Sequence, residues 1–464
     1  MSGSTTRWQR LGRGARATTK VLFLLLALYM VGGFVATRMV QDPVDYSLGG
    51  AAVAAPVLPT AAPGRTLVRG AISVHTGRSH DAEGTLEEVA EAAAAAGLDF
   101  VILGDHVGDW AEGGAGLLDP ARLQGVLLVP GLELPVKDAG RVLAVGMDTL
   151  PREWLGSVEE LVAEVDEGDG FLSIVHPRSP RGRERWDGLG RPGIDAWESF
   201  DVSEMARLRQ DELWVGYRIA AILASMATGR GHESIAHFWK EGTETQALLA
   251  YDSVRASTPT ALTGGLNHHP KARILGHLVP AYAPFFRTVV NHVRLREPLA
   301  DDPFQARAQL LAALRTGRLF VTLGDGGDVP DFDVWADDGG ATTTMGERGV
   351  WTGSGVLGIR VPASTGRVAV RILRDGAEAA WLDARGGDAL GWTIPGPGSY
   401  RVELFEPGWK VGGLRLGFRP WIVSNPVELR GGPSATEGGV EVGVGGEVSP
   451  LDGESVGDPR TDEG

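Results

Sequence analysis

Short apolar runs alternate with amphipathic stretches from residue 68 to about residue 300. The stretch from Thr85 to Gly97 predicts a helix, because Thr85 and Glu88 form a capping box and glycine readily adopts the left-handed conformation that ends helices. A second Ser-x-x-Glu capping box begins the run SVEELVAEV. Buried runs that alternate with helices are typical of parallel strands joined by helical crossovers. We therefore expect an α/β barrel over residues 68–300.

This pattern is interrupted once and then ends. Residues 203–256 have mostly helical periodicity and predict a helical insertion that packs on the barrel. After about residue 316, short apolar runs are separated by Gly, Pro and Asp, which predicts antiparallel strands. We expect a small β-sandwich over residues 301–430. Residues 431–464 are Gly-rich and acidic and are expected to form a disordered tail.

The chain begins with a basic segment followed by an apolar run. Residues 1–20 contain Lys and Arg but no acid, and residues 21–38 are about long enough to cross a bilayer as a helix. A cleaved signal peptide is the alternative, but Phe34 is too large for the −3 position that accompanies Ala36 at −1. We favour an uncleaved anchor with its N-terminus in the cytoplasm. Residues 39–67 are then a linker to an extracytoplasmic domain, periplasmic or at the cell surface.

Composition narrows the chemistry that this chain of 464 residues can perform. It contains no cysteine, which excludes disulfides, thiolate nucleophiles, Fe–S clusters and Cys-based zinc sites. A transition-metal site must therefore use His and carboxylate ligands. The formal net charge of −15 predicts no nucleic-acid partner, since binding phosphates requires exposed Lys and Arg.

Polar residues recur where the predicted strands end. In a parallel α/β barrel these ends converge on one face, where active sites are built. A single histidine after a strand is usually a solvated or satisfied side chain, but recurrence after successive strands favours a shared polar site over coincidence. The set consists of His75, Asp105, His106, Glu133, His176, Glu198, Asn267, His268 and His269.

Glu198, His268 and several other histidines are weaker candidates for the site. Glu198 either positions a ligand histidine from behind or is a buried polar residue of the barrel. His268 is adjacent to ligand candidates, and its side chain is expected to point away from them. His232, His237 and His292 fall in predicted helices and are expected outside the site.

Six segments contain these strand-end residues, in the order VRGAISVHTGRSHDAEGTLEEV, LDFVILGDHVGDW, VPGLELPV, SIVHP, DAWESFD and GGLNHHP. In this order they resemble the successive motifs of the polymerase and histidinol phosphatase (PHP) domain. SHD followed by GTLEEV is most similar to the carbaryl-hydrolase-like (CehA/McbA) branch. The resemblance covers about residues 68–430 and implies a distorted (β/α)7 barrel that holds two or three divalent metals and typically hydrolyses phosphoesters. GRLFVT and RPWIVSNPVEL resemble the β-sandwich often attached to that branch.

The residue-by-residue match to the family is incomplete in the first motif. His75 matches the second His of the H-x-H motif, whereas Ser73 stands where the first is expected. His80 or Asp81 matches the ligand that follows the motif's Ser, and a one-residue insertion leaves both open.

The later motifs match more fully but not everywhere. Asp105 and His106 match T-D-H, with Gly104 in place of the Thr. Glu133 matches the glutamate that bridges metals in the family, and His176 matches the histidine of H-P.

Arg141 occupies the place of the G-H histidine, Asn267 replaces the Asp of G-S-D-A-H, and His269 matches its final His. Ser and Asn are weaker ligands than His and carboxylate, and Arg cannot ligate a cation. His106, His269 and either His80 or Asp81 keep a three-ligand set, which with water is the usual open arrangement of catalytic zinc.

These matches imply a site for one or two divalent ions (Zn, Mn or Fe) that activates water against a small anionic or ester substrate. Arg141 either clamps an anionic substrate beside Glu133 or forms a structural ion pair with it. Glu133 or Asp105 would handle protons. The candidate metal ligands are His75, His80, Asp81, His106, Glu133, His176, Asn267 and His269, and the candidate catalytic residues are Asp105, Glu133 and Arg141.

Two functions of different classes follow from the sequence. The first is a membrane-anchored PHP-type metal-dependent hydrolase, a phosphoesterase. The second is an inactive PHP-like pseudoenzyme that serves as an extracytoplasmic binding or scaffolding module with unknown protein partners. The residues at positions 73, 141 and 267 favour the second function, whereas the retained histidines and Glu133 favour the first.

Overall fold

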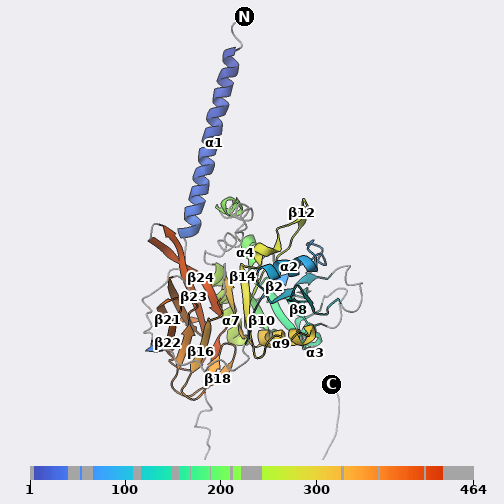
Figure 1. Ribbon diagram of the computed structural model, residues 1–464, viewed down its shortest axis with the longest axis vertical. Coiled ribbons are helices and arrows are strands. Elements are labelled where there is room, and N and C mark those ends of the chain that lie inside the picture. Colours follow the sequence, from blue (N-terminus) through green and yellow to red (C-terminus); the bar gives the residue numbers. More distant parts are fainter. Residues whose placement is uncertain are drawn as a thin grey trace, which may run out of the picture.

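The computed structural model has a mixed α/β architecture with one long N-terminal helix, α1 (Thr5–Met39), that projects from the body of the protein (Figure 1). Within α1, the stretch Thr18–Val35 has a mean hydropathy of 1.9 and is only 6% buried, which is typical of a membrane anchor or a signal sequence. The structure describes residues 5–39, 53–54, 66–107, 117–147, 156–167, 169–188, 190–208, 213–220, 243–324, 329–363, 366–411 and 414–431.

A six-stranded sheet carries most of the residues that the sequence places at strand ends. Its strand order is β11-β10-β9-β8-β7-β4. The strands are β4 (Asp105–His106), β7 (Gly131–Val136), β8 (Gly140–Val145), β9 (Phe171–Val175), β10 (Ala196–Asp201) and β11 (Ala261–Gly265).

A twelve-stranded sheet runs from the N-terminal strands into the C-terminal part of the chain. Its order is β18-β25-β23-β24-β15-β14-β2-β3-β6-β5, with β20 and β21 attached at β23. The strands are β2 (Thr66–Val74), β3 (Phe100–Leu103), β5 (Ala121–Leu123), β6 (Val126–Val129), β14 (Val289–Leu295), β15 (Leu319–Leu323), β18 (Arg348–Trp351), β20 (Arg367–Arg374), β21 (Ala377–Arg385), β23 (Gly398–Val411), β24 (Leu414–Ser424) and β25 (Val427–Gly431).

Two smaller sheets and a set of helices complete the described fold. The five-stranded sheet consists of β1 (Val53–Ala54), β22 (Ala389–Thr393), β19 (Val356–Arg360), β16 (Asp333–Asp337) and β17 (Thr342–Thr344). A hairpin pairs β12 (Ala272–Ile274) with β13 (His277–Val279). The helices are α2 (Leu86–Ala95), α3 (Val158–Glu167), α4 (Val202–Leu208), α7 (Thr243–Ser257), α8 (Tyr282–Phe285) and α9 (Pro303–Arg315).

Both predicted capping boxes form. The side chain of Thr85 accepts a hydrogen bond from the backbone N–H of Glu88 while the Glu88 carboxylate accepts one from the N–H of Thr85, and Gly97 ends the turn at φ 71°. Ser157 and Glu160 make the same reciprocal pair before α3. These contacts are local, which is why the sequence predicts them correctly.

The expectation of uniformly parallel strands is wrong at β8. Strands β2, β3 and β6 are parallel, as are β9, β10 and β11, but β8 is antiparallel to β7 and β9. Three residues between β7 and β8 leave no room for a helical crossover, and Asp138 at φ 57° helps close a hairpin instead. The amino end of β8 therefore lies beside the carboxyl ends of its neighbours, with Arg141 opposite Pro135 and Val175.

Two acidic residues expected at strand ends lie inside strands. Glu133 is within β7, opposite His106 of β4, and Glu198 is within β10, which continues to Asp201. Pro130 separates β6 from β7, so the apolar run and the glutamate belong to different strands.

The hydrophobic core consists of separate clusters of buried side chains, which different groups of strands contribute. Helix α9 packs against the β2 and β3 side of the body, where Leu310 and Leu314 join a cluster with Ile72 and Phe100. The C-terminal strands of the five- and twelve-stranded sheets share another cluster. Because one sheet continues through residues 68–300 and 301–430, the division into two domains at residue 300 stays a prediction.

The segments outside the predicted barrel and sandwich are described only in part. Within the expected linker 39–67, residues 53–54 form β1, which pairs with β22. Within the expected insertion 203–256, the described residues include α4, a helical segment at 215–220 and α7. Of the expected tail, 431–464, Gly431 ends β25 and residues 432–464 lie outside the described residues.

Candidate metal centre

Four side chains converge at the carboxyl ends of β2, β4 and β11. They belong to His75, Asp81, His106 and His269, and their candidate ligand atoms all lie within 4.8 Å of one another. Strand β11 reaches this point because the residues that follow it bond to the end of β2: the N–H of Leu266 donates to the carbonyl of Ile72. The backbone folding thus brings together residues from three distant parts of the sequence.

The surroundings of His75 fix which ring nitrogen faces the cluster. The hydroxyl of Ser79 donates to Asp105 at 2.9 Å, so its oxygen must accept from Nδ1 of His75, which lies 3.1 Å away. This leaves the Nε2 lone pair of His75 buried, without a hydrogen bond among the described residues. A buried nitrogen with an unused lone pair is the arrangement that metal coordination requires.

His269 is oriented in the same way by a backbone group. Its Nδ1 lies 2.8 Å from the carbonyl oxygen of Asn267, which can only accept, so Nδ1 carries the proton. Nε2 is left 3.4 Å from Oδ2 of Asp81, while Oδ1 of Asp81 is buried without a hydrogen-bond partner in the described part of the chain. Burial lowers the pKa of His269 and that of His106, which keeps both imidazoles neutral.

These donors fit a divalent transition metal. Three imidazoles and one carboxylate suit zinc, manganese or iron, and two buried polar atoms without a hydrogen bond in one cluster indicate a missing partner. The structure also separates the two alternatives that the sequence left open. Asp81 joins the cluster, whereas His80 is exposed and stacks on the ring of His106 with centroids 5.1 Å apart.

Glu133 links the cluster to His176. One carboxylate oxygen of Glu133 lies 3.4 Å from Nε2 of His75, and the other lies 3.6 Å from Nε2 of His176. Burial alone would raise the pKa of Glu133, but His176 holds it well below its ordinary value. Burial opposes charging of His176 as well, yet Asp201, 2.5 Å from its Nδ1, and Glu133 raise its pKa well above the usual value.

Arg141 reaches this group from the amino end of the antiparallel strand β8. Its Nη1 lies 2.8 Å from Glu133, so the ion pair that the sequence offered as one alternative is present. The same atom lies 3.3 Å from Nδ1 of His106. A guanidinium only donates, so this contact uses the Nδ1 lone pair of His106 and competes with the tautomer in which Nε2 is free to ligate a cation. The side chain of Arg141 is 25% exposed and can therefore also contact a molecule from solution.

Two of the residues that depart from the family pattern share a different partner. Ser73 and Asn267 donate hydrogen bonds of 3.0 Å and 2.7 Å to the two carboxyl oxygens of Glu198. Burial and nearby Asp201 raise the pKa of Glu198 well above its ordinary value. Glu198 therefore does not orient a histidine, as one reading of the sequence had it. It completes a buried network beside the metal cluster.

The backbone is unusual at this network. Ser73, His176 and Asn267 have positive φ angles of 60°, 51° and 44°. Left-handed conformations are uncommon for residues other than glycine and are retained mainly where the surrounding structure requires them, often at functional sites.

Asp105 lies behind the cluster rather than in it. Its carboxylate accepts hydrogen bonds from the N–H and hydroxyl of Thr76, at 2.6 Å and 2.8 Å, and from Ser79. Ser79 also accepts from the backbone N–H of His106 at 2.9 Å. This set of contacts ties the turn after β2 to β4 and positions two of the ligand candidates.

Sequence reasoning did not single out Ser79 and Asp201. Ser79 stands inside the RSHD motif, and Asp201 ends β10, so polarity at a strand end was an available signal for Asp201. His268 points away from the cluster: its ring packs on Phe285 with centroids 3.9 Å apart, and Nε2 lies 3.2 Å from the carbonyl of Pro280.

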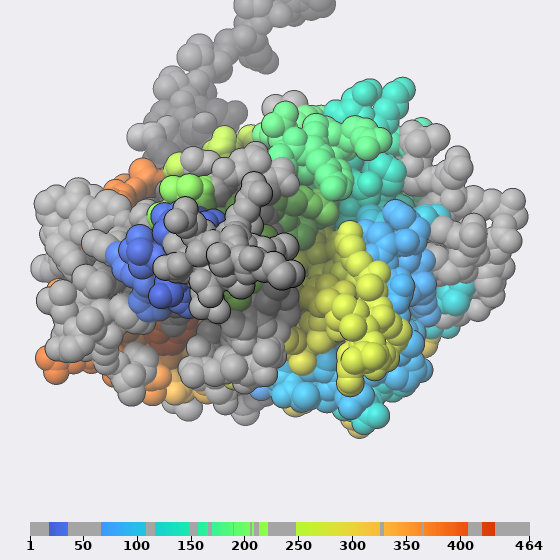
Figure 2. Space-filling model, turned by 90° about the horizontal axis from the view of Figure 1, so that it is seen from above, coloured from blue at the N-terminus to red at the C-terminus, as the bar shows by residue number. Residues whose placement is uncertain are grey.

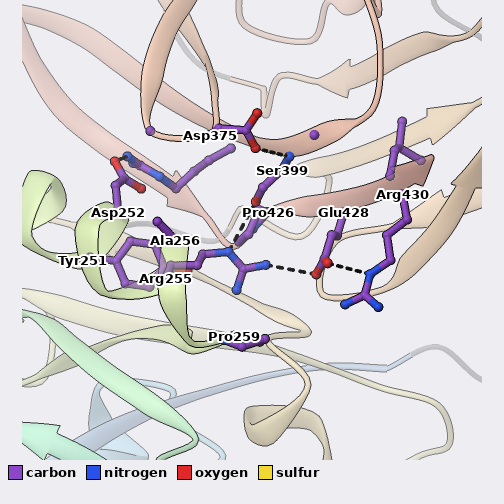
Figure 3. Close-up of a pocket in the computed structure, with 14 residues that line it drawn as sticks. Tyr251, Asp252, Arg255, Ala256, Pro259, Asp375, Ser399, Pro426, Glu428 and Arg430 are labelled. Carbon is purple, nitrogen blue, oxygen red and sulfur yellow. Dashed lines mark hydrogen bonds and ion pairs between the residues drawn. The ribbon is translucent and has the colours of Figure 1, made fainter. Parts of the chain in front are cut away.

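A separate cavity lies where α7 meets the C-terminal strands (Figure 3). Its volume is about 250 Å³, and most of its charged side chains pair with one another. Arg255 and Arg430 both contact Glu428, and Arg401 pairs with Asp252. These pairs join α7 to the β-strands.

Three solved structures are similar to parts of this chain. The first is a two-domain protein containing a predicted PHP-like metal-dependent phosphoesterase from Bacteroides vulgatus ATCC 8482, with 11% identity, a TM-score of 0.34, and coverage of 82% of this chain and 99% of that one. PsfC from Pseudomonas syringae PB-5123 is 14% identical, with a TM-score of 0.33 and coverage of 53% and 88%. The lesion-specific endonuclease PfuEndoQ from Pyrococcus furiosus is 13% identical, with a TM-score of 0.29 and coverage of 62% and 60%.

No protein-family model and no curated protein matches the chain. The expected absence of a nucleic-acid partner stays a prediction from the charge of the sequence. The functional proposal therefore rests on the geometry of the metal centre.

Proposed function

We propose that this protein is a membrane-anchored, PHP-type metal-dependent hydrolase that cleaves phosphoesters. The observation that carries the proposal is the cluster of His75, Asp81, His106 and His269, in which two buried ligand atoms make no hydrogen bond among the described residues. Structural histidines and carboxylates are normally satisfied by hydrogen bonds, so the orphaned atoms are better explained by a cation.

The four residues of the cluster would hold one divalent ion, zinc, manganese or iron. When bound, such an ion polarises a phosphoester oxygen and lowers the pKa of a coordinated water. Arg141, which is partly exposed, binds a negatively charged oxygen of the substrate, and Glu133 beside it accepts a proton. His176, whose charged form Asp201 favours, lowers the pKa of Glu133 and so holds it in its ionised form.

Asp105 has a different role in this proposal from the proton transfer that the sequence suggested. Both its oxygens accept hydrogen bonds from Thr76 and Ser79, so we assign it to positioning His75 and His106. Asn267 likewise positions His269 through its carbonyl oxygen.

The expected fold and location belong to the same proposal. Two hydrogen bonds support closure of a (β/α)7 barrel: the N–H of Leu266 donates to the carbonyl of Ile72, and the N–H of His75 donates to the carbonyl of His268. The shared cluster of the two C-terminal sheets supports a β-sandwich. The exposed apolar helix α1 supports a membrane anchor, with the body extracytoplasmic. Placement in the CehA/McbA branch rests on the motifs alone.

A second candidate function is an inactive binding or scaffolding module. It is favoured by the network of Ser73, Asn267 and Glu198, which occupies positions where the family places ligands, and by the ion pair of Arg141. Under this proposal the four-residue cluster would hold a structural ion or none.

Metal content and turnover separate these two functions. The full chain, purified in detergent, is analysed for bound metal and assayed on a panel of chromogenic phosphoesters with manganese or zinc. We expect one ion per chain and turnover, both lost in His269→Ala and both kept in His80→Ala, which removes an adjacent imidazole that is not in the cluster. An absence of turnover, or turnover unchanged by His106→Ala, would favour the scaffolding module.

A further inference from the structure

The hairpin β12–β13 ends in an exposed apolar tip. Leu275 is 95% exposed, the highest value among the large apolar side chains of the described residues, and Ile274 is 59% exposed. The turn residues Leu275 and Gly276 both have positive φ, 51° and 84°. Asn or Gly is favoured at such positions, and a bulky leucine is not. The chain thus keeps an apolar side chain at a strained position where it contacts water.

The base of this hairpin is anchored to the metal centre. β12 begins three residues after His269, and the N–H of Glu83, in the turn that holds Asp81, donates to the carbonyl of Pro270 at 2.8 Å. Arg273 makes two hydrogen bonds, of 2.8 Å and 2.6 Å, to the carboxylate of Glu88 in α2. The tip therefore has a defined position relative to the ligand cluster.

The chain from His269 to Ile274 is short. Five residues span at most about 18 Å even when fully extended. Whatever surface the tip touches is consequently close to the metal centre.

The hairpin and α1 project from the same end of the body. In Figure 1 both point upward, and Figure 2, viewed from that end, shows the blue residues of α1 and the yellow segment that contains the hairpin on the facing surface. A third apolar element lies beside α1. The hydroxyl of Tyr29 donates to the carbonyl of Leu213 at 2.8 Å, and its ring lies 5.2 Å from that of Trp214.

This third element adds to the apolar character of that end of the molecule. Leu213 is 72% exposed and Ile219 is 51% exposed. Tyr29 belongs to the apolar stretch Thr18–Val35, so residues 213 and 214 lie against the part of α1 that would cross the membrane. A bilayer crossed by α1 would thus meet both residues 213–220 and the hairpin tip.

We propose that the tip of hairpin β12–β13 inserts into the membrane that α1 crosses, so that the metal centre takes as substrate a phosphoester of a membrane lipid. This inference rests on the proposed function and adds the substrate class to it. An exposed apolar tip on a water-soluble surface has no favourable partner, whereas a bilayer buries it. The cluster would then act on headgroups at the surface into which the tip inserts.

Membrane insertion is tested with a label on the tip. Because the chain has no cysteine, Leu275→Cys creates a single thiol for an environment-sensitive fluorophore. The full chain is reconstituted in vesicles of phosphatidylcholine and phosphatidylglycerol, with or without lipids that carry a quenching doxyl group. Val350→Cys is the matched control, since Val350 is apolar, 58% exposed, and lies in β18 at the opposite end of the body (Figure 1).

We expect doxyl lipids to quench the label at position 275 and to leave the label at position 350 unchanged. Equal quenching, or none at either position, would overturn membrane insertion. A water-soluble quencher gives an independent readout of the same contact. We expect it to quench the label at position 275 less in vesicles than it quenches the same label on a peptide free in water.

The substrate class is tested with a tip variant that keeps the turn. Leu275→Asn suits the positive φ and removes the apolar group. We expect about a tenfold lower rate on a phospholipid in these vesicles and an unchanged rate on a water-soluble bis(p-nitrophenyl) phosphate. Turnover of neither substrate would refute the proposed function itself. Turnover of the soluble phosphoester only, or a lipid rate that Leu275→Asn does not change, would refute the lipid substrate and leave the hydrolase.

Discussion

Ser73 and Asn267 are joined through one carboxyl group, because each donates a hydrogen bond to a different oxygen of Glu198. All three side chains are buried, and Ser73 and Asn267 both have the left-handed backbone conformation. The two departures from the family pattern are therefore coupled. They form a buried hydrogen-bonded network close to the candidate metal cluster.

Gly265 is the residue that makes room for this network. A Cβ atom at position 265 would lie 2.2 Å from the carboxyl carbon of Glu198. We expect Gly265→Ala to lower the free energy of unfolding by about 1–3 kcal/mol, because the carboxyl group would have to leave its two donors. Urea unfolding of the full chain measures the change. Gly182→Ala, where a Cβ meets nothing within 4 Å, is the control, and equal stability of the two variants would contradict the prediction.

Ser79 is expected to control metal affinity without touching the metal. Ser79→Ala removes the oxygen that accepts from Nδ1 of His75 and so releases the ring tautomer. Loss of such a partner typically weakens metal binding about 10–100-fold. Calorimetric titration with zinc measures the dissociation constant, with Ser257→Ala in α7 as a control. A dissociation constant equal to that of the unmodified chain would show that Ser79 does not orient His75.

Arg141 is expected to oppose metal binding. Its guanidinium lies beside His106 and pairs with Glu133, so Arg141→Met removes a positive charge next to the ligands and leaves Glu133 with His75 and His176 as its neighbours. We expect metal affinity to rise about tenfold or more, since even partly screened charges at this separation interact by more than about 1.4 kcal/mol. Competition with a chelator measures the affinity, and Arg141→Lys keeps the charge as a control. Weaker binding by Arg141→Met would show that the arginine supports the site.

His292 is expected to make stability depend on pH. It lies in β14 rather than in the helix that the sequence predicts, stacks on Phe320, and bonds to Thr322 at 3.0 Å. Burial and the nearby arginines lower its pKa to about 3 from 6.5. Below pH 6.5 the unfolded chain binds a proton that the folded protein does not, so stability falls as pH decreases from 6.5 toward 3.

The contribution of His292 has a maximum slope of about 1.4 kcal/mol per pH unit. Urea unfolding at neutral pH and at about pH 5 should therefore show a smaller loss of stability for His292→Gln than for the unmodified chain. His277→Gln, on the hairpin, is the control. An identical pH dependence in His292→Gln would show that this histidine is not the titrating group.

Much of the fold is predictable from short-range patterns. The capping boxes at Thr85 and Ser157 form as expected because the bonded groups are three residues apart. The antiparallel direction of β8 is not predictable in this way. It follows from the short β7–β8 connection, whose conformation depends on Asp138 rather than on hydrophobic periodicity.

The sequence by itself determined the kinds of donor available to this protein and the apolar N-terminal helix. It has no cysteine, it places His75, His106 and His269 near predicted strand ends, and it replaces expected ligands at Ser73 and Arg141. Residue type and local periodicity are enough for such conclusions.

Only the tertiary structure decided which of these residues meet. It selected Asp81 over His80, used Ser79 and a backbone carbonyl to set the ring tautomers, and brought Arg141 to Glu133 from an antiparallel strand. The physical reason is distance along the chain. Ligand geometry depends on side chains from strands far apart in sequence, and no local pattern encodes how those strands are paired.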